Sequence, residues 1–296
     1  MIMGHIGFGG IFDYFIHAFH MPMFFFISGF FYRRRDCGIG EYVSKKAKSL
    51  LIPYISFGLA HYLASLILDG VSIKPLIHLL SINTNGLPIA GALWFLTALF
   101  FTDIVYFMLD RWNLKWLIIP LVLFGSFADR MLPYPLPWAL SASFVGLGLY
   151  WFGEMSKKYE NKFITLLNMN WLQILIVGVA TTGLIFANGY INMREGRYAF
   201  LLLFWLNALL SIYLGISISK LICKIERIEW LTSIGRNSIV YVCLNQIVIR
   251  ALFKLFSYVW MSTIVSHLLV LASSMVILYL MSILFTKTEL KFFIGK

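Results

Sequence analysis

Long apolar stretches alternate with short polar segments along the whole chain. A membrane-spanning helix needs roughly 20 mostly apolar residues, and this length divides the chain into nine complete candidate spans. They cover about 11–32, 50–69, 90–109, 115–128, 136–153, 171–188, 198–219, 237–256 and 262–285. The connections are mostly short, and no repeat or linker separates one part of the chain from another. The pattern predicts an all-α polytopic membrane protein with a single domain over residues 1–296.

The composition supports this fold class and excludes several others. The 296 residues are 60% hydrophobic, 17% aromatic and 12% charged, and the mean hydropathy is +0.83. Soluble globular domains carry about 25% charged residues, so a soluble enzyme, a disordered protein and a nucleic-acid-binding protein are excluded. The net charge of +11 comes from basic clusters beside apolar spans, which is typical of a membrane protein. Three cysteines, Cys37, Cys223 and Cys243, give no disulfide framework.

The distribution of lysine and arginine predicts how the spans are oriented. If loop 33–48 is cytoplasmic and the spans alternate, 18 of the 24 lysines and arginines fall on the inner side and 6 on the outer side. An excess of basic residues on the cytoplasmic side sets the topology of membrane proteins. We therefore expect a multi-pass protein of the inner or plasma membrane with a cytoplasmic C-terminus.

The first ten residues, MIMGHIGFGG, would lie at the outer face with no helix upstream to bring them there. They are too short for a signal peptide and lack its basic start. The glycines at positions 7, 9 and 10 are typical of the turn of a helical hairpin. We therefore expect residues 1–6 to be the last turns of a helix whose beginning is missing, and coding sequence upstream that continues in frame.

The span at 11–32 contains three ionisable side chains, Asp13, His17 and His20. Ionisable groups within a span are costly and usually functional. Spacings of four and three residues place these side chains on one helical face, where Asp13 can fix the tautomer of His17. His5, across the glycine turn, would lie at similar depth. This group is a candidate site, and the alternative is that the histidines are packing groups hydrogen-bonded between helices. No metal is expected, because no cysteine or HExxH-type spacing accompanies them.

Two further polar groups lie at the cytoplasmic side. The loop at 33–48 contains six basic residues: Arg33, Arg34, Arg35, Lys45, Lys46 and Lys48. Such a cluster either anchors the topology and binds anionic lipid or binds the phosphates of a cofactor, and charge alone leaves both open. The span at 237–256 begins with Arg236, Asn237 and Ser238, an N-cap-like polar group beside a cation. Tyr241, Asn245 and Gln246 form a polar patch deeper in that helix.

The run HAFHMPMFFFISGFFY at residues 17–32 resembles a known family. It is similar to the membrane-bound acyltransferase-3 family, and most similar to its polysaccharide O-acetyltransferase branch, the fucose-4-O-acetylase-like proteins, which show FHMPxFFxxSGF at this place. Individually weaker similarities follow in order, at Leu50–Tyr54, at Leu93–Leu96 and at Ile234–Ser238. The last of these resembles the family's IGxxSL element, so the resemblance covers nearly the whole chain.

The resemblance implies about ten transmembrane helices, of which this chain would hold nine and the end of the first. It also implies transfer of an acetyl group from cytoplasmic acetyl-CoA to a hydroxyl of an extracytoplasmic or lipid-linked glycan. His5 matches the histidine of the family's Arg-x10-His motif, whose arginine would precede Met1. We therefore expect His5 as general base, with His17 or His20 and Asp13 orienting it or the acceptor. The expected donor site combines the basic loop, Trp94 and residues 236–238, and the polar patch would line a cavity.

Two departures from the family pattern affect these expectations. Lysines stand at 45, 46 and 48 where many members have arginines, which keeps attraction for phosphate but loses bidentate geometry. Asn245 stands where relatives often have a histidine, and an amide cannot act as a base.

The residues leave two other function classes open. A glycolipid or anion transporter would use polar residues in the spans as a permeation path, although the helix pattern shows no inverted repeat. A non-catalytic relative would fit the missing arginine. The expected partners of an enzyme are a surface polysaccharide or lipid-linked sugar and the membrane lipids, with no nucleic acid, and the oligomeric state is not indicated.

The charge distribution generates the first testable prediction. A cysteine placed in the loop at 33–48 should resist an impermeant thiol reagent in intact cells, because the charge bias puts this loop in the cytoplasm. Labelling is expected once the cells are permeabilised. Labelling in intact cells would show that every span has the opposite orientation to the one predicted.

Overall fold

The computed structural model describes residues 1–68, 70–81, 86–89, 91–223 and 229–296. In these ranges the chain folds into helices joined by turns, with a single isolated bridge between Asn192 and Arg197 as its extended structure. Lys224 and Arg227, counted above with the inner-side charges, lie outside the described residues.

The helices follow the predicted spans. Their bounds are α1 Ile2–Ile6, α2 Gly10–Phe30, α3 Ile39–Lys46, α4 Ile52–Leu68, α5 Lys74–Ser81, α6 Trp94–Arg111, α7 Ile118–Met131, α8 Leu140–Lys158, α9 Glu160–Leu166, α10 Trp171–Asn188, α11 Leu201–Ile222, α12 Glu229–Arg236, α13 Ser238–Phe256 and α14 Thr263–Lys287. Short helical turns cover Gly91–Leu93 before α6, Met193–Glu195 between α10 and α11, and Glu289–Ile294 at the end.

Seven helical segments of the described chain are long and apolar enough to cross a membrane. They are Gly10–Phe30, Ile39–Leu68, Gly91–Arg111, Trp171–Asn188, Leu201–Ile222, Ser238–Phe256 and Thr263–Lys287. Helices α7 and α8 occupy the other two predicted spans without belonging to this set, and α7 has only 14 residues. The predicted class, an all-α polytopic membrane protein, is confirmed.

The second span begins earlier than predicted. Helix α3, a wider turn over Ala47–Leu51 and α4 form one segment of 30 residues, Ile39–Leu68. The lysines at 45, 46 and 48 are therefore helical, and the irregular connection after α2 is shorter than the predicted loop. The start of this helical segment is amphipathic, and its polar residues exclude it from a span that is predicted from a run of apolar residues.

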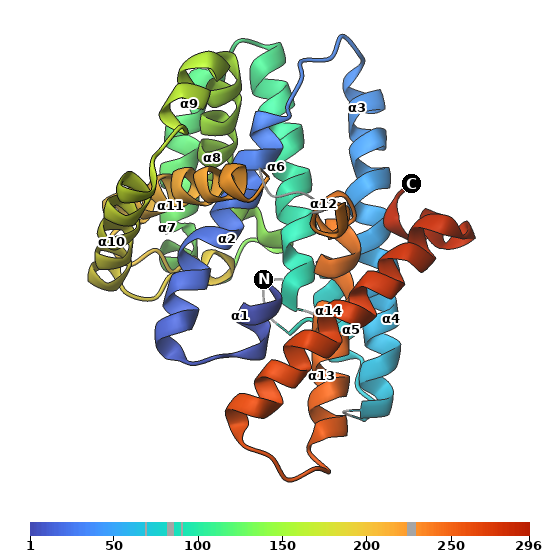
Figure 1. Ribbon diagram of the computed structural model, residues 1–296. Coiled ribbons are helices and arrows are strands. Elements are labelled where there is room, and N and C mark those ends of the chain that lie inside the picture. Colours follow the sequence, from blue (N-terminus) through green and yellow to red (C-terminus); the bar gives the residue numbers. More distant parts are fainter. Residues whose placement is uncertain (69, 82–85, 90, 224–228) are drawn as a thin grey trace.

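The two ends of the helix assembly carry different elements. Figure 1 shows the α2–α3 connection and α9 at one end, and the α1–α2 and α13–α14 turns at the other. The C-terminal turn Glu289–Ile294 packs against α4, and Gly295 lies against the main chain of Lys48. The C-terminus is thus near the helical part of the basic cluster.

The predicted hairpin turn joins α1 to α2. Gly7 and Gly9 have φ angles of 78° and 121°, in the left-handed region that glycine adopts without strain. The turn lays α1 back against α2, and a Cβ at Gly4 would lie 3.0 Å from Ile16 and 3.8 Å from the His17 ring. This contact places His5 beside the histidine face of α2.

Helices α2 and α8 approach so closely that two glycines are required. A Cβ added to Gly29 would collide with the main chain of Tyr150, and one added to Gly153 would collide with the main chain of Phe26. Small residues at such a crossing allow two membrane helices to pack backbone against backbone. The crossing fixes the position of α2 and of the side chains it carries.

The crossing leads to a stability prediction. Gly29→Ala and Gly153→Ala should each destabilise the protein by about 1–3 kcal/mol, because the added methyl overpacks a contact between backbones. Gly183→Ala in α10 is the matched control, since nothing lies within 4 Å of its Cβ position. Thermal unfolding in detergent micelles measures the difference, and equal melting temperatures for all three variants would contradict this account of the crossing.

Candidate active site

A cavity of about 200 Å³ brings the three candidate histidines together. His5 comes from α1, and His17 and His20 come from α2. Trp94 at the start of α6, Arg194 between α10 and α11, and Gln246 of α13 complete most of the polar and aromatic lining. The convergence of His5 with the histidines of α2, expected from the hairpin, is what the structure shows.

The histidines of α2 have defined tautomers. The Nδ1–H of His17 donates to the carbonyl oxygen of Asp13 at 2.9 Å, and that of His20 donates to the carbonyl oxygen of Ile16 at 2.7 Å. A carbonyl oxygen can only accept, so the proton of each neutral ring is on Nδ1 and Nε2 keeps its lone pair. Each of these rings can therefore accept a proton or a hydrogen bond at Nε2.

The expected role of the Asp13 side chain is corrected by this bonding. Its main-chain carbonyl, one helical turn before His17, sets the tautomer in place of its carboxylate. Asp13 is not among the residues that line the cavity, and its Oδ1 is buried with no hydrogen-bond partner in the described part of the chain. Within the same described ranges, no three His, Cys, Asp or Glu side chains are arranged to hold a metal ion.

Arg194 is a cavity residue that the sequence analysis counted only as an outer-side charge. A Cβ at Gly91 would clash with its guanidinium, so a side chain there would push the flexible end of Arg194 aside. Burial lowers the pKa of the Arg194 guanidinium, but an arginine side chain keeps its proton in proteins. The cavity thus contains a fixed cation beside imidazoles. No local pattern signals this placement, because Arg194 and the histidines are brought together only by the tertiary fold.

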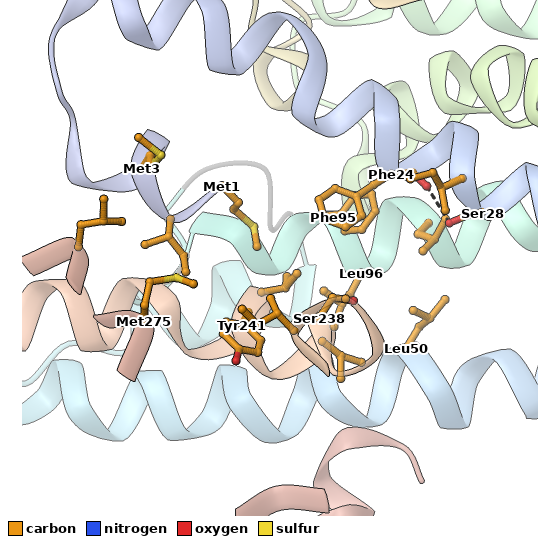
Figure 2. A pocket seen from close by; sticks show the side chains of 18 residues that line it. Met1, Met3, Phe24, Ser28, Leu50, Phe95, Leu96, Ser238, Tyr241 and Met275 are labelled. Atoms are coloured by element: carbon orange, nitrogen blue, oxygen red, sulfur yellow. Dashed lines mark hydrogen bonds between the residues drawn. The ribbon is translucent and has the colours of Figure 1, made fainter. Parts of the chain in front are cut away.

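Two larger cavities are linked to the histidine cavity through shared lining residues, the first directly and the second by way of the first. The first, of about 830 Å³, is mostly apolar and is lined from α1, α2, α6, α13 and α14 (Figure 2). It shares Met1 with the histidine cavity. The second, of about 620 Å³, contains basic side chains and shares Ile27, Ser28, Leu50 and Leu99 with the apolar one. The three cavities therefore form a series from the basic segment after α2 to the histidines.

The basic cluster divides between this series and the surface. Arg33, Arg35 and Lys46 line the basic cavity, whereas Arg34 lies 3.9 Å from Asp110 in a neighbouring hollow. Lys45 and Lys48 are exposed and line none of the three cavities. Arg33 and Arg35 are themselves exposed where they line the basic cavity, so only part of the expected phosphate-binding cluster faces this open cavity.

The residues at the start of α13 also separate. Arg236 is exposed, and Asn237 is the N-cap residue but makes no side-chain cap hydrogen bond, contrary to the predicted capping group. The predicted polar patch is split three ways. Tyr241 lines the apolar cavity together with Ser238, and Gln246 lines the histidine cavity. Asn245 is buried and donates to the carbonyl oxygens of Tyr241 and Val242, at 2.7 and 2.9 Å, within its own helix.

A network of carboxylates beside the basic cavity was missed by sequence reasoning. Asp103 pairs with Lys46 at 2.8 Å and accepts from the Tyr150 hydroxyl at 2.7 Å. Lys115 bridges Asp110 and Glu154 at 2.8 and 2.7 Å. The sequence did contain a signal for this network. All three acids lie in or at the end of predicted spans, where ionisable groups need partners.

Two tyrosines extend this network. The hydroxyl of Tyr32 donates to Asp110 at 2.9 Å, and that of Tyr106 donates to Glu154. Burial, followed by the hydrogen bond to the Asp110 carboxylate, raises the pKa of Tyr32, so this hydroxyl remains a donor at neutral pH.

The charge of Lys46 is balanced by Asp103, so the arginines are the better phosphate ligands at the basic cavity.

The comparisons identify the family. The chain matches the acyltransferase-3 family model, described as an acyltransferase domain, over residues 1–286. It belongs to this family, as the motif at residues 17–32 indicated, and it is a multi-pass membrane acyltransferase. No curated protein matches the chain, and no solved structure matches it.

The Lys46–Asp103 pair generates a further prediction. Asp103→Asn should destabilise the protein by about 3 kcal/mol, because it leaves the lysine without a counter-charge at a largely buried place. The double variant Lys46→Met with Asp103→Asn should recover part of this loss. Glu160→Gln is the matched control, since it removes a carboxylate from an exposed pair with Lys157, where such pairs contribute about 0–1 kcal/mol. Equal losses in thermal unfolding for the two single variants would contradict the role given to Asp103.

Proposed function

We propose that this acyltransferase moves an acetyl group from cytoplasmic acetyl-CoA to a hydroxyl of an extracytoplasmic or lipid-linked glycan. The observation that carries the proposal is the series of three adjoining cavities, basic at one end and lined by histidines at the other. Acetyl-CoA has charged phosphates at one end, a long thin arm and a reactive thioester at the other end. These three parts match the basic, apolar and histidine cavities in that order.

The donor would bind with its phosphates at the basic cavity. Arg33 and Arg35 line this cavity, and guanidinium groups can bind phosphate through two hydrogen bonds at once. The pantetheine arm would pass through the apolar cavity, whose volume of about 830 Å³ lies in the range of small-molecule sites, roughly 300–1,000 Å³. The thioester would then reach the histidines at Trp94.

The reaction requires a base for the acceptor and a stabiliser for the oxyanion. The hydroxyl oxygen attacks the thioester carbonyl carbon while its proton moves to Nε2 of His5. The C–S bond then breaks, the acetyl ester is released, and the thiolate of CoA takes the proton from the imidazole. Arg194, a fixed cation in the same cavity, would stabilise the oxyanion, and His17 and His20 would accept hydrogen bonds from the sugar at Nε2.

The acceptor would approach from the opposite side to the donor. The histidine cavity includes residues 192–194 of the connection between α10 and α11, on the side that the charge bias assigns to the exterior. A surface polysaccharide or lipid-linked sugar in the inner or plasma membrane is therefore the proposed acceptor.

His5→Ala tests this function. Loss of a general base lowers the rate by about 10²–10⁴, and the KM for acetyl-CoA should change little because His5 does not line the basic cavity. The matched control is His267→Ala in α14, whose ring contacts Phe8 and Phe253 outside the cavity. The measurement is acetyl transfer in membranes with equal amounts of folded protein, followed by mass spectrometry of the glycan.

Two results would contradict the proposal in different ways. No transfer by the wild-type protein with any glycan acceptor would favour a non-catalytic relative. Normal turnover by His5→Ala together with an inactive His20→Ala would move the role of base to α2 and leave the acyl transfer in place.

A further inference from the structure

The Gln246 side chain is hydrogen-bonded to His5. Its amide Nε2 lies 2.9 Å from Nδ1 of His5, across 241 positions of sequence, and both residues line the histidine cavity. In this orientation the amide N–H donates and Nδ1 accepts, so the proton of the neutral ring is on Nε2. A ring in this tautomer cannot take a proton from a hydroxyl at Nε2.

The other end of the same amide has the opposite character. Oε1 of Gln246 is buried and makes no hydrogen bond to any residue that the structure describes. The terminal torsion of glutamine is broad and roughly two-fold, so the amide can turn over without a change in the rest of the side chain. Oε1 of Gln246 would then accept from Nδ1–H of His5. The imidazole Nε2 of His5 would be left with its lone pair in the cavity.

The histidines of α2 have no such choice. Their Nδ1 partners are main-chain carbonyl oxygens, which accept in every orientation. Among the three histidines of the cavity, His5 alone has a partner that can both donate and accept within the described chain.

We infer that Gln246 is a positioning residue that selects the working tautomer of His5: with Oε1 on Nδ1–H it leaves Nε2 free as the base, and with Nε2–H on Nδ1 it blocks that role. The inference rests on the proposed function of His5. Gln246 acts through the imidazole and needs no contact with the reacting atoms.

Two variants separate hydrogen bonding from packing. Gln246→Glu offers only acceptor oxygens, so it holds the proton on Nδ1 and should keep most of the wild-type kcat. Gln246→Met has a similar length and no hydrogen bond, so kcat should fall by at least about tenfold, as expected when a catalytic histidine loses its tautomer, while the KM for acetyl-CoA stays unchanged. Gln173→Met is the matched control, because Gln173 lies in the capping box of α10 outside the cavity.

A spectroscopic measurement does not depend on turnover. Imidazole ¹⁵N resonances distinguish Nδ1–H from Nε2–H, and the resonances of His5 in micelles are assigned by their loss in His5→Ala. Compared with Gln246→Met, the Gln246→Glu variant should show these resonances shifted towards the Nδ1–H tautomer, and Gln173→Met should give the wild-type resonances.

Two results would overturn the inference. One is an inactive Gln246→Glu beside an active Gln246→Met, which would make the Nε2–H tautomer the working one. The other is a His5 spectrum that is the same in Gln246→Glu and Gln246→Met, because the tautomer would then not depend on this hydrogen bond. Absence of transfer by the wild-type protein would contradict the proposed function instead, and the spectrum would still decide whether Gln246 selects the tautomer.

Discussion

Helices α2 and α8 touch backbone to backbone at Gly29 and Gly153, and the placement of the whole candidate site depends on this contact. Helix α2 runs unbroken from the histidines to the segment that carries Arg33 and Arg35. The crossing therefore sets the position of both ends of the cavity series at once. A methyl group at either glycine would separate the helices and displace both ends of the cavity series relative to α8.

The carboxylate network fixes how α3, α6 and α8 are placed relative to one another. Tyr150 of α8 donates to Asp103 of α6, and Asp103 also neutralises Lys46 of α3. Charges inside a membrane protein are costly unless paired, so these contacts favour one arrangement of α3, α6 and α8. The same helix α6 begins with Trp94 at the histidine cavity. These polar residues thus orient the helices that form the cavities.

The sequence predicted the features that depend on local chemistry. Apolar length located the spans, glycines located the hairpin between α1 and α2, and the motif at residues 17–32 identified the family. The approach of His5 to His17 followed from the hairpin. Local patterns gave wrong predictions where several partners compete for one polar group. The His17 ring donates to the main-chain carbonyl of Asp13 and not to its carboxylate. The Asn245 amide donates to a carbonyl oxygen of its own helix. Arg194 and Gln246 were brought to the histidines by contacts between distant helices, which no spacing along the chain encodes.

The central claim is that a donor bound at the basic cavity reacts at histidines on the far side of the membrane. The most direct measurement uses the purified protein in sealed liposomes, with labelled acetyl-CoA supplied only on the side of the Arg33–Lys48 segment and a glycan acceptor enclosed on the other. The account predicts that label appears on the enclosed glycan while acetyl-CoA itself does not cross. Transfer only when donor and acceptor share one side of the membrane would contradict it.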